Sequence, residues 1–170
     1  MAIKTKDLII KSFFELLGKN NIEQITVTDL VEKCDISRQT FYYHFKDIPS
    51  MLEWIFNNYL ETALTAVEKT NNIADSMRVY AAFINKIHPI IEASLKTGSF
   101  ITVYNLIFNS YKAITDNILI KYYQLSDKSR HYSVLFWANA LCGLTINEAQ
   151  KKNPDYDVLF KMIGASFSKS

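Results

Sequence analysis

The chain has 170 residues, of which 49% are hydrophobic and 14% aromatic, with only 4 Gly and 3 Pro. This composition excludes a disordered or collagen-like chain and favours a mostly helical globular protein. The formal net charge of +2 is too small to indicate a nucleic-acid binder by itself, so the position of each charge has to carry that argument.

Two helices are predicted in the first 34 residues. Apolar side chains recur with a period near 3.6 residues from Asp7 to Leu17, which predicts an amphipathic helix that ends at Gly18. The stretch "KNNIEQI" follows as a polar connection. Thr26 is expected to be the N-cap of the second helix. The inner side of that helix carries four apolar residues: Val27, Leu30, Val31 and Cys34.

A third helix is expected from Arg38 to about Lys46, with Ser37 as its N-cap. Only the turn "DIS" separates it from the second helix, which is typical of a helix-turn-helix motif. Phe41 and Phe45 lie one turn apart and share the face that would be buried. The outward face carries side chains that can donate to phosphates or base edges: Gln39, Tyr42, Tyr43 and Lys46, with Thr40 on its shoulder and Arg38 at the helix start.

Six further helices are expected in the rest of the chain. A long helix begins at Pro49 or Ser50 and runs to about Lys69. The others are expected near residues 74–87, 89–96, 100–123, 128–152 and 156–167, with breaks at "HP", "TGS", "QLSD" and "KNPD". The sequence therefore predicts an all-α protein of about nine helices in two domains, residues 1–48 and 49–170.

The segment "ITVTDLVEKCDISRQTFYYHFKDIPSMLEWIF" resembles the N-terminal domain of TetR-family transcriptional regulators. The family signature is a threonine at the start of helix two, a short turn, and a tyrosine-rich recognition helix that closes in histidine and phenylalanine. In this chain the signature falls on Thr26, the turn "CDIS", and residues 42–45. The resemblance covers residues 5–56, and "FYYHFKDIPSMLEWIF" is most similar to the subgroup that includes the dihydroxyacetone kinase operon activator.

The resemblance implies a homodimer that binds a palindromic double-stranded DNA operator. It assigns phosphate contacts to Thr26, Tyr42, His44 and Lys46, and base-edge contacts to Arg38, Gln39, Thr40 and Tyr43. It also implies an effector, either a small molecule or a partner protein, that alters DNA affinity. It implies no cofactor and no metal. The chain departs from the family at Asp35, where glycine is usual in the turn.

Two other classes of function compete with DNA binding. An enzyme is not expected, because the chain has no phosphate-binding Gly-rich loop and no GxSxG or HExxH motif, and His44, His88 and His131 lie far apart in the sequence. The alternative is a helical protein-interaction co-regulator that has lost direct DNA binding. The equal numbers of basic and acidic residues among the first 48 favour this alternative, while the outward face of the third helix favours DNA binding.

Aromatic and polar residues in the C-terminal helices are expected to line an effector pocket, unless they simply fill a helical core. The candidate ligand-binding residues are Tyr59, Phe83, His88, Tyr104, Phe108 and Tyr111.

The stretch "VLFWANALCGLTINEA", residues 134–149, carries apolar side chains in nearly every direction around a helix. Because a helix that is apolar all round must be buried all round, a second copy of the chain is expected to cover one side. The other possibility is a central helix wrapped by its own chain. The predicted dimer interface consists of Trp137, Leu141, Gly143, Leu144, Leu159, Met162 and Ile163.

Cys34 and Cys142 lie far apart in apolar surroundings, which predicts two buried free thiols. Lys11 and Glu15 interrupt the apolar run near the N-terminus, and no apolar run approaches the roughly 20 residues that span a bilayer. We therefore expect a cytoplasmic protein that makes no membrane contact.

Overall fold

The computed structural model describes the backbone of residues 2–167 and the side chains of residues 5–165. Eight α-helices and one 3₁₀-helix, η1, are formed by these described residues, so the all-α prediction is confirmed. In chain order they are α1 (Ala2–Leu17), η1 (Ile22–Gln24), α2 (Val27–Cys34), α3 (Arg38–His44), α4 (Ile48–Glu68), α5 (Ile73–Ser94), α6 (Phe100–Tyr122), α7 (Asp127–Ala149) and α8 (Tyr156–Phe167).

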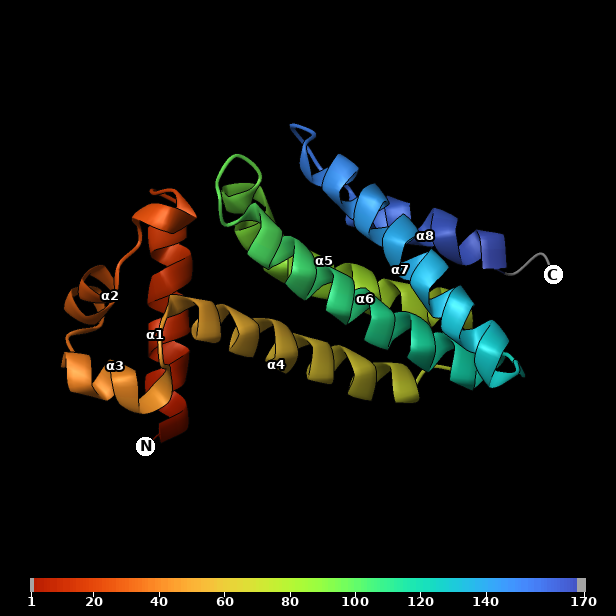
Figure 1. Ribbon diagram of the computed structural model, residues 1–170, viewed down its shortest axis with the longest axis horizontal. Helices are drawn as coiled ribbons and strands as arrows, with labels where there is room; N and C mark the ends of the chain where they lie inside the picture. The colour runs from red at the N-terminus through yellow and green to blue at the C-terminus, as the bar shows by residue number, and fades with distance from the viewer. Residues whose placement is uncertain (1, 168–170) are drawn as a thin grey trace.

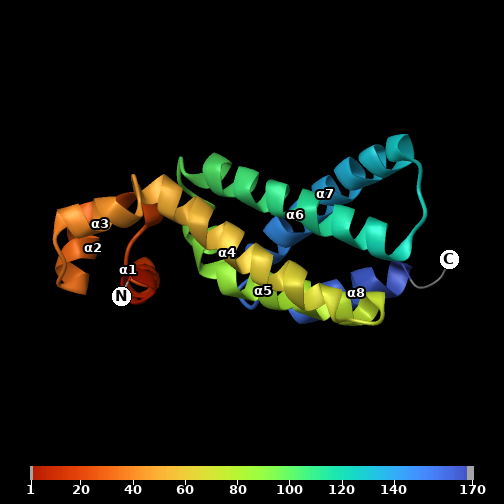
Figure 2. The same ribbon diagram turned by 90° about the horizontal axis from the view of Figure 1, so that it is seen from below.

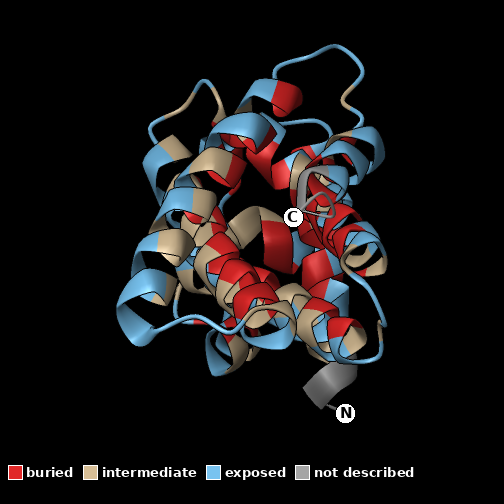
Figure 3. Ribbon diagram, turned by 90° about the vertical axis from the view of Figure 1, so that its right-hand side faces the viewer, coloured by how far each residue is buried: buried red, intermediate tan, exposed pale blue. Residues whose placement is uncertain are grey.

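The helices α1, α2 and α3 gather at one end of the molecule, and we call them the N-terminal unit (Figure 1). Helix α4 leads out of this unit and runs along α5 (Figure 2). Helix α5 is central, because it packs against α4, α6 and α8 and also contacts α1, α7 and η1. Helix α7 packs mainly against α6. Buried residues face the middle of this helical assembly, and exposed residues form its outer surface (Figure 3).

One expected break does not exist. The sequence "HP" predicts a boundary between two helices, but α5 continues through Pro89 to Ser94. An interior proline removes one backbone hydrogen bond and costs about 3 kcal/mol. Ile90 and Ile91, directly after it, are fully buried, and burying one such side chain contributes roughly 1.5–3 kcal/mol. Pro89 itself is exposed, so water can reach the backbone near it. Burial of Ile90 and Ile91 in the last turns of α5 outweighs the loss of one backbone hydrogen bond.

The connection after α1, which the sequence predicts to be polar, contains two buried apolar side chains. Residues 22–24 form η1, and Ile22 and Ile25 on either side of Glu23 and Gln24 are buried. Their side chains belong to the main hydrophobic core, so η1 is held against the body of the protein.

The two cysteines are free and buried, as predicted. Burial raises the pKa of the Cys142 thiol to about 12, so this group stays protonated and unreactive at neutral pH. Among the described residues, no helix is both long enough and apolar enough to cross a membrane.

Candidate nucleic-acid interface

The start of α2 is fixed by a reciprocal capping box. The Thr26 hydroxyl oxygen accepts a hydrogen bond from the Asp29 backbone N–H at 3.2 Å, and the Asp29 carboxylate accepts from the Thr26 N–H and hydroxyl at 2.7 Å each. These bonds from the Thr26 side chain and backbone lower the pKa of the Asp29 carboxyl group. The Thr26 hydroxyl proton is thus already used inside the protein, so a phosphate at this helix start would meet the free backbone N–H groups of the first turn.

The turn between α2 and α3 depends on Asp35. Its backbone adopts the left-handed conformation, with φ 52° and ψ 48°, which explains why glycine is usual here. The Asp35 N–H donates to the Glu32 carbonyl at 3.3 Å, and the Ile36 N–H donates to the Val31 carbonyl at 3.0 Å. These two bonds close the C-terminus of α2 and turn the chain into α3.

Helix α3 is capped at its start and anchored on one face. The Ser37 hydroxyl accepts from the Thr40 N–H at 3.0 Å, as the sequence predicts for an N-cap. Phe41 and Phe45 are buried in the core, and the Phe45 ring packs edge-on against Trp54 of α4 at 6.0 Å between ring centroids. The anchors leave the opposite face of α3 in solvent.

That opposite face holds the candidate DNA-binding side chains. Tyr42 is 53% exposed and Tyr43 is 78% exposed, so both rings are accessible to a binding partner. Arg38 and Gln39 are also exposed, and so is Lys46, which follows the end of the helix. The remaining two, Thr40 and His44, are half-buried. The structure therefore brings seven of the eight candidates together along α3 and its end, and Thr26 lies at the start of the preceding helix.

Two cations are held in place beside this face. The Arg38 guanidinium donates to the Thr28 hydroxyl of α2, a contact for which the sequence offers no signal. Four of its five N–H donors remain for another partner. The Lys6 ammonium lies 5.5 Å from the Phe45 ring and 4.9 Å from the Trp54 ring, so cation–π contacts fix it near the end of α3.

Several acidic groups of the N-terminal unit are engaged in the protein itself. Glu15 pairs with Lys33 at 2.8 Å, and the hydrogen bond and charge of Lys33 lower the pKa of the Glu15 carboxyl. Asp47 caps α4 by accepting from the Ser50 N–H at 2.8 Å. Helix α3 itself contains Arg38 and no acidic residue, so its outward face is positively charged although the formal charge of the unit is balanced.

The sequence of this unit matches known regulators. Residues 9–53 match the family model described as "Bacterial regulatory proteins, tetR family". The chain is also 40% identical over 57 residues to the HTH-type dhaKLM operon transcriptional activator DhaS of Lactococcus lactis subsp. lactis (strain IL1403). The N-terminal segment is therefore similar to the TetR family over these residues. The alignment with DhaS covers 34% of this chain and only 30% of that relative.

Solved structures share the fold of the whole chain, including the C-terminal helices. The dihydroxyacetone kinase operon activator DhaS superposes with a TM-score of 0.78 at 20% identity, over 98% of this chain and 95% of that one. The fatty acid degradation regulator FadR from Bacillus halodurans gives a TM-score of 0.68 at 11% identity, over 98% and 95% of the two chains. At such identities the likeness shows the fold alone. The resemblance to TetR regulators and to the DhaS subgroup is confirmed.

The six candidate ligand residues do not line one common cavity. Tyr59 and Phe83 line a cavity of about 250 Å³ between α4 and α5, with the Lys86 ammonium 5.3 Å from the Tyr59 ring. Tyr111 is fully buried and its hydroxyl hydrogen-bonds Thr145 of α7, which is the arrangement of a core residue.

The other three candidates lie on α5 and α6. His88 pairs through Nδ1 with the Tyr156 hydroxyl at 2.9 Å, and burial lowers the pKa of its imidazole although Glu92 opposes that effect. Tyr104 and Phe108 stack on α6 with ring centroids 6.5 Å apart.

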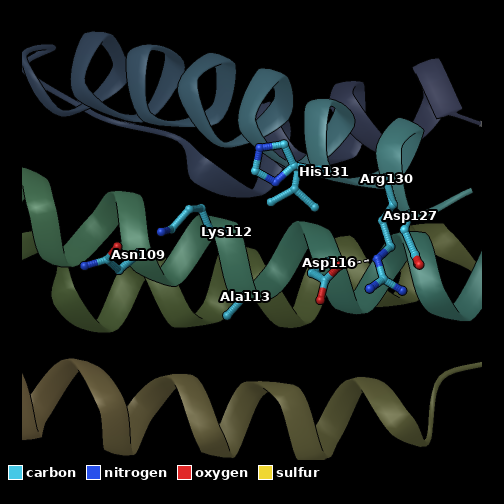
Figure 4. Close-up of a pocket in the computed structure, with 8 residues that line it drawn as sticks. Asn109, Lys112, Ala113, Asp116, Asp127, Arg130 and His131 are labelled. Atoms are coloured by element: carbon cyan, nitrogen blue, oxygen red, sulfur yellow. Dashed lines mark ion pairs between the residues drawn. The ribbon is translucent and has the colours of Figure 1, made fainter.

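A polar groove of about 660 Å³ lies between α6 and α7 (Figure 4). Arg130 of α7 pairs with Asp116 of α6 at 3.2 Å, and Lys112 and His131 line the same groove. The sequence does not point to this groove, because its residues are ordinary surface polar residues on two separate helices. In the part of the chain that the structure describes, no group of three His, Cys, Asp or Glu residues is placed to hold a metal ion.

The predicted dimer residues separate into three groups by exposure. Leu141 is 4% exposed and Ile163 8% exposed, so both pack in the core of their own chain. Trp137 and Leu159 are half-buried. Leu144 is 41% exposed and Met162 65% exposed, and open space surrounds the position where Gly143 would carry a Cβ. Phe136 and Tyr132, which the sequence analysis does not single out, are exposed on α7 as well.

Proposed function

We propose that this protein is a sequence-specific DNA-binding transcriptional regulator of the TetR type and not an enzyme. The observation that carries the proposal is the outward face of α3, where Tyr42 and Tyr43 are exposed beside Arg38 and Gln39. Exposed tyrosines next to cationic and amide side chains are suited to phosphates and base edges in a major groove. Buried Phe41 holds this face outward on a helix that begins and ends at defined caps.

The phosphate contacts are assigned to Tyr42, His44 and Lys46, and to the start of α2 at Thr26. The base-edge contacts are assigned to Arg38, Gln39, Thr40 and Tyr43. For Arg38 to reach a base, its guanidinium would rotate away from Thr28 or use the donors that Thr28 leaves free.

The functional unit in this proposal is a homodimer on a palindromic operator. One helix of seven residues reads few base pairs, so useful specificity needs two half-sites about one helical turn apart, or a multiple of it. The exposed apolar residues of α7 and α8, including Phe136, Leu144 and Met162, form the surface that a second copy would cover.

An effector would act through the C-terminal helices. The cavity beside Tyr59 and Phe83 lies between α4, which follows directly on α3, and the central helix α5. A small molecule or partner protein that changed the packing of α4 on α5 would tilt the N-terminal unit and change DNA affinity.

The deciding experiment is selection of bound sites from random duplex DNA with the purified full chain. We expect a palindromic motif with two half-sites. Enrichment of no sequence, together with weak binding of all duplexes, would favour the helical co-regulator that works through a protein partner.

A further inference from the structure

Two open clefts flank η1 at the junction between the N-terminal unit and the C-terminal helices. A cavity of about 200 Å³ lies between η1, the start of α4 and the start of α6, with Ile25, Leu52 and Thr102 in its wall. A wider one of about 540 Å³ lies beside the contact between the end of α1 and α5, with Leu17 and Pro89 in its wall. These clefts leave space beside the buried Ile22 and Ile25 for the unit to tilt.

Glu23 bridges this junction. Its Oε1 atom accepts a hydrogen bond from the Ser99 backbone N–H at 2.9 Å and another from the Ser99 hydroxyl at 3.2 Å. Glu23 belongs to η1, and Ser99 is the N-cap residue of α6, 76 positions later in the chain. The two hydrogen bonds thus join the N-terminal unit to a helix of the C-terminal part.

The glutamate lies at the N-terminus of α6. The Ser99 side chain makes no capping hydrogen bond within α6, and its hydroxyl and backbone N–H bind Glu23 instead. A helix N-terminus carries partial positive charge, which favours a carboxylate. A Cβ atom at Gly98 would lie 3.0 Å from the Glu23 Oε1 atom, so glycine at this position leaves room for the close approach.

The contact connects directly to the DNA-binding elements. Residue Ile25 follows η1 as its C-cap, and the next residue, Thr26, is the N-cap of α2. Helix α6 in turn packs against α4, α5 and α7. A movement of α6 would therefore be passed through Glu23 to α2 without passing through α4.

We infer that Glu23 is a positioning residue, whose carboxylate sets the tilt of the N-terminal unit relative to α6 and so the separation of the two recognition helices in a dimer. The last part of this inference rests on the proposed function, because the separation matters only where two copies read one operator.

The first test measures the tilt without DNA. Spin labels are placed on cysteines introduced at the exposed positions Glu32 and Lys128, in labelled chains diluted with unlabelled ones so that distances within one chain are read. The native cysteines are buried, which directs labelling to the introduced thiols. We expect Glu23→Ala to broaden the distance distribution about twofold, as released rigid-body motion should. Glu23→Gln keeps an acceptor oxygen without the charge, and we expect partial rescue of the narrow distribution.

The second test measures half-site spacing on the palindrome selected by the wild-type chain. One added base pair rotates and displaces a half-site, so we expect the wild type to lose about tenfold in affinity. The Glu23→Ala variant should lose about threefold or less in affinity on the same duplex, because its two N-terminal units can adjust their separation. Glu53→Gln on α4 is the matched control: it removes one exposed carboxylate without touching Ser99, and should keep the wild-type discrimination.

The two tests distinguish a failure of the positioning role of Glu23 from a failure of the proposed DNA-binding function. An unchanged distance distribution in both Glu23 variants overturns the inference, and so does unchanged spacing discrimination where the distribution has broadened. If the wild-type chain selects no palindrome, the proposed function fails, while the label distances still decide whether Glu23 positions the unit. Should Glu23→Ala unfold, Glu23→Gln and Ser99→Ala carry the same test, with a smaller broadening expected.

Discussion

Thr26 and Asp29 form reciprocal hydrogen bonds at the start of α2. The Asp29 carboxylate accepts two hydrogen bonds of 2.7 Å from Thr26, and the Thr26 hydroxyl accepts one from the Asp29 N–H. The first turn of the helix-turn-helix is therefore closed by side chains three residues apart. Thr26 has a structural role in addition to the phosphate contact assigned to it.

We expect Thr26→Ala to lower the free energy of unfolding by about 1 kcal/mol, the usual cost of losing an N-cap. Urea denaturation followed by circular dichroism would measure it. Thr62→Ala in the exposed interior of α4 is the control, and it should be neutral because alanine favours a helix. Equal stability of the two variants would contradict the capping role.

Asp35 is the one described non-glycine residue with positive φ. Glycine adopts this conformation without a steric penalty, so Asp35→Gly should raise the free energy of unfolding by roughly 0.5–1 kcal/mol. Asp35→Val should lower it by about 1–2 kcal/mol, since a β-branched side chain is poorly tolerated there. The same denaturation experiment checks both, and the two variants must shift the midpoint in opposite directions.

The two groups of DNA contacts should respond differently to substitution. We expect Tyr42→Ala and Lys46→Ala to weaken binding to all duplexes alike, with Lys46→Ala reducing the salt slope by about 1. Arg38→Ala and Gln39→Ala should instead change base preference, by roughly 1–3 kcal/mol for each lost base contact. Titrations on matched and mismatched duplexes at several salt concentrations would show this. Lys69→Ala, an exposed lysine after α4, is the control; equal affinities for all five variants would remove the assignment.

The dimer surface can be tested at Gly143, because open space surrounds it and an added side chain need not disturb the core. We expect Gly143→Arg to give a folded monomer by light scattering, with specific DNA affinity reduced at least about tenfold. A charge at buried Leu141 should unfold the chain instead, since that residue packs in its own core. A Gly143→Arg protein that remains dimeric would place the interface elsewhere.

His88 should make stability depend on pH. Burial lowers its pKa in the folded chain from an ordinary value of 6.5, so the unfolded chain binds the proton more readily. Its contribution is therefore complete above about pH 7 and is lost as the pH falls through 6.5 toward the folded pKa. His88→Asn, which cannot titrate, should show a flatter change in unfolding free energy between about pH 7.5 and roughly 5. If the wild-type chain loses no more unfolding free energy over this pH range than His88→Asn, the titration of His88 does not affect stability.

The sequence by itself determined the helix-turn-helix. The ends of α2 and the start of α3 are set by hydrogen bonds between residues within five positions of each other, at Thr26, Asp35 and Ser37. The type and spacing of these residues are therefore enough to predict where α2 begins and ends and where α3 begins. The separation of buried Phe41 and Phe45 from exposed Tyr42 and Tyr43 follows from the helical period alone. The outward face of the recognition helix is therefore predictable from residue spacing.

Only the tertiary structure decided the features that depend on distant partners. Helix α5 passes through Pro89 because burial of the following turns outweighs a local penalty. Helix α7 is apolar on several sides, and its sequence could not tell that Leu141 faces the core while Leu144 faces solvent. Glu23 and Ser99 meet only after the N-terminal unit docks on α6, since nothing within a few residues of either one specifies the other. Local hydrogen bonds can be predicted from residue spacing, whereas burial and long-range contacts follow from how the helices pack.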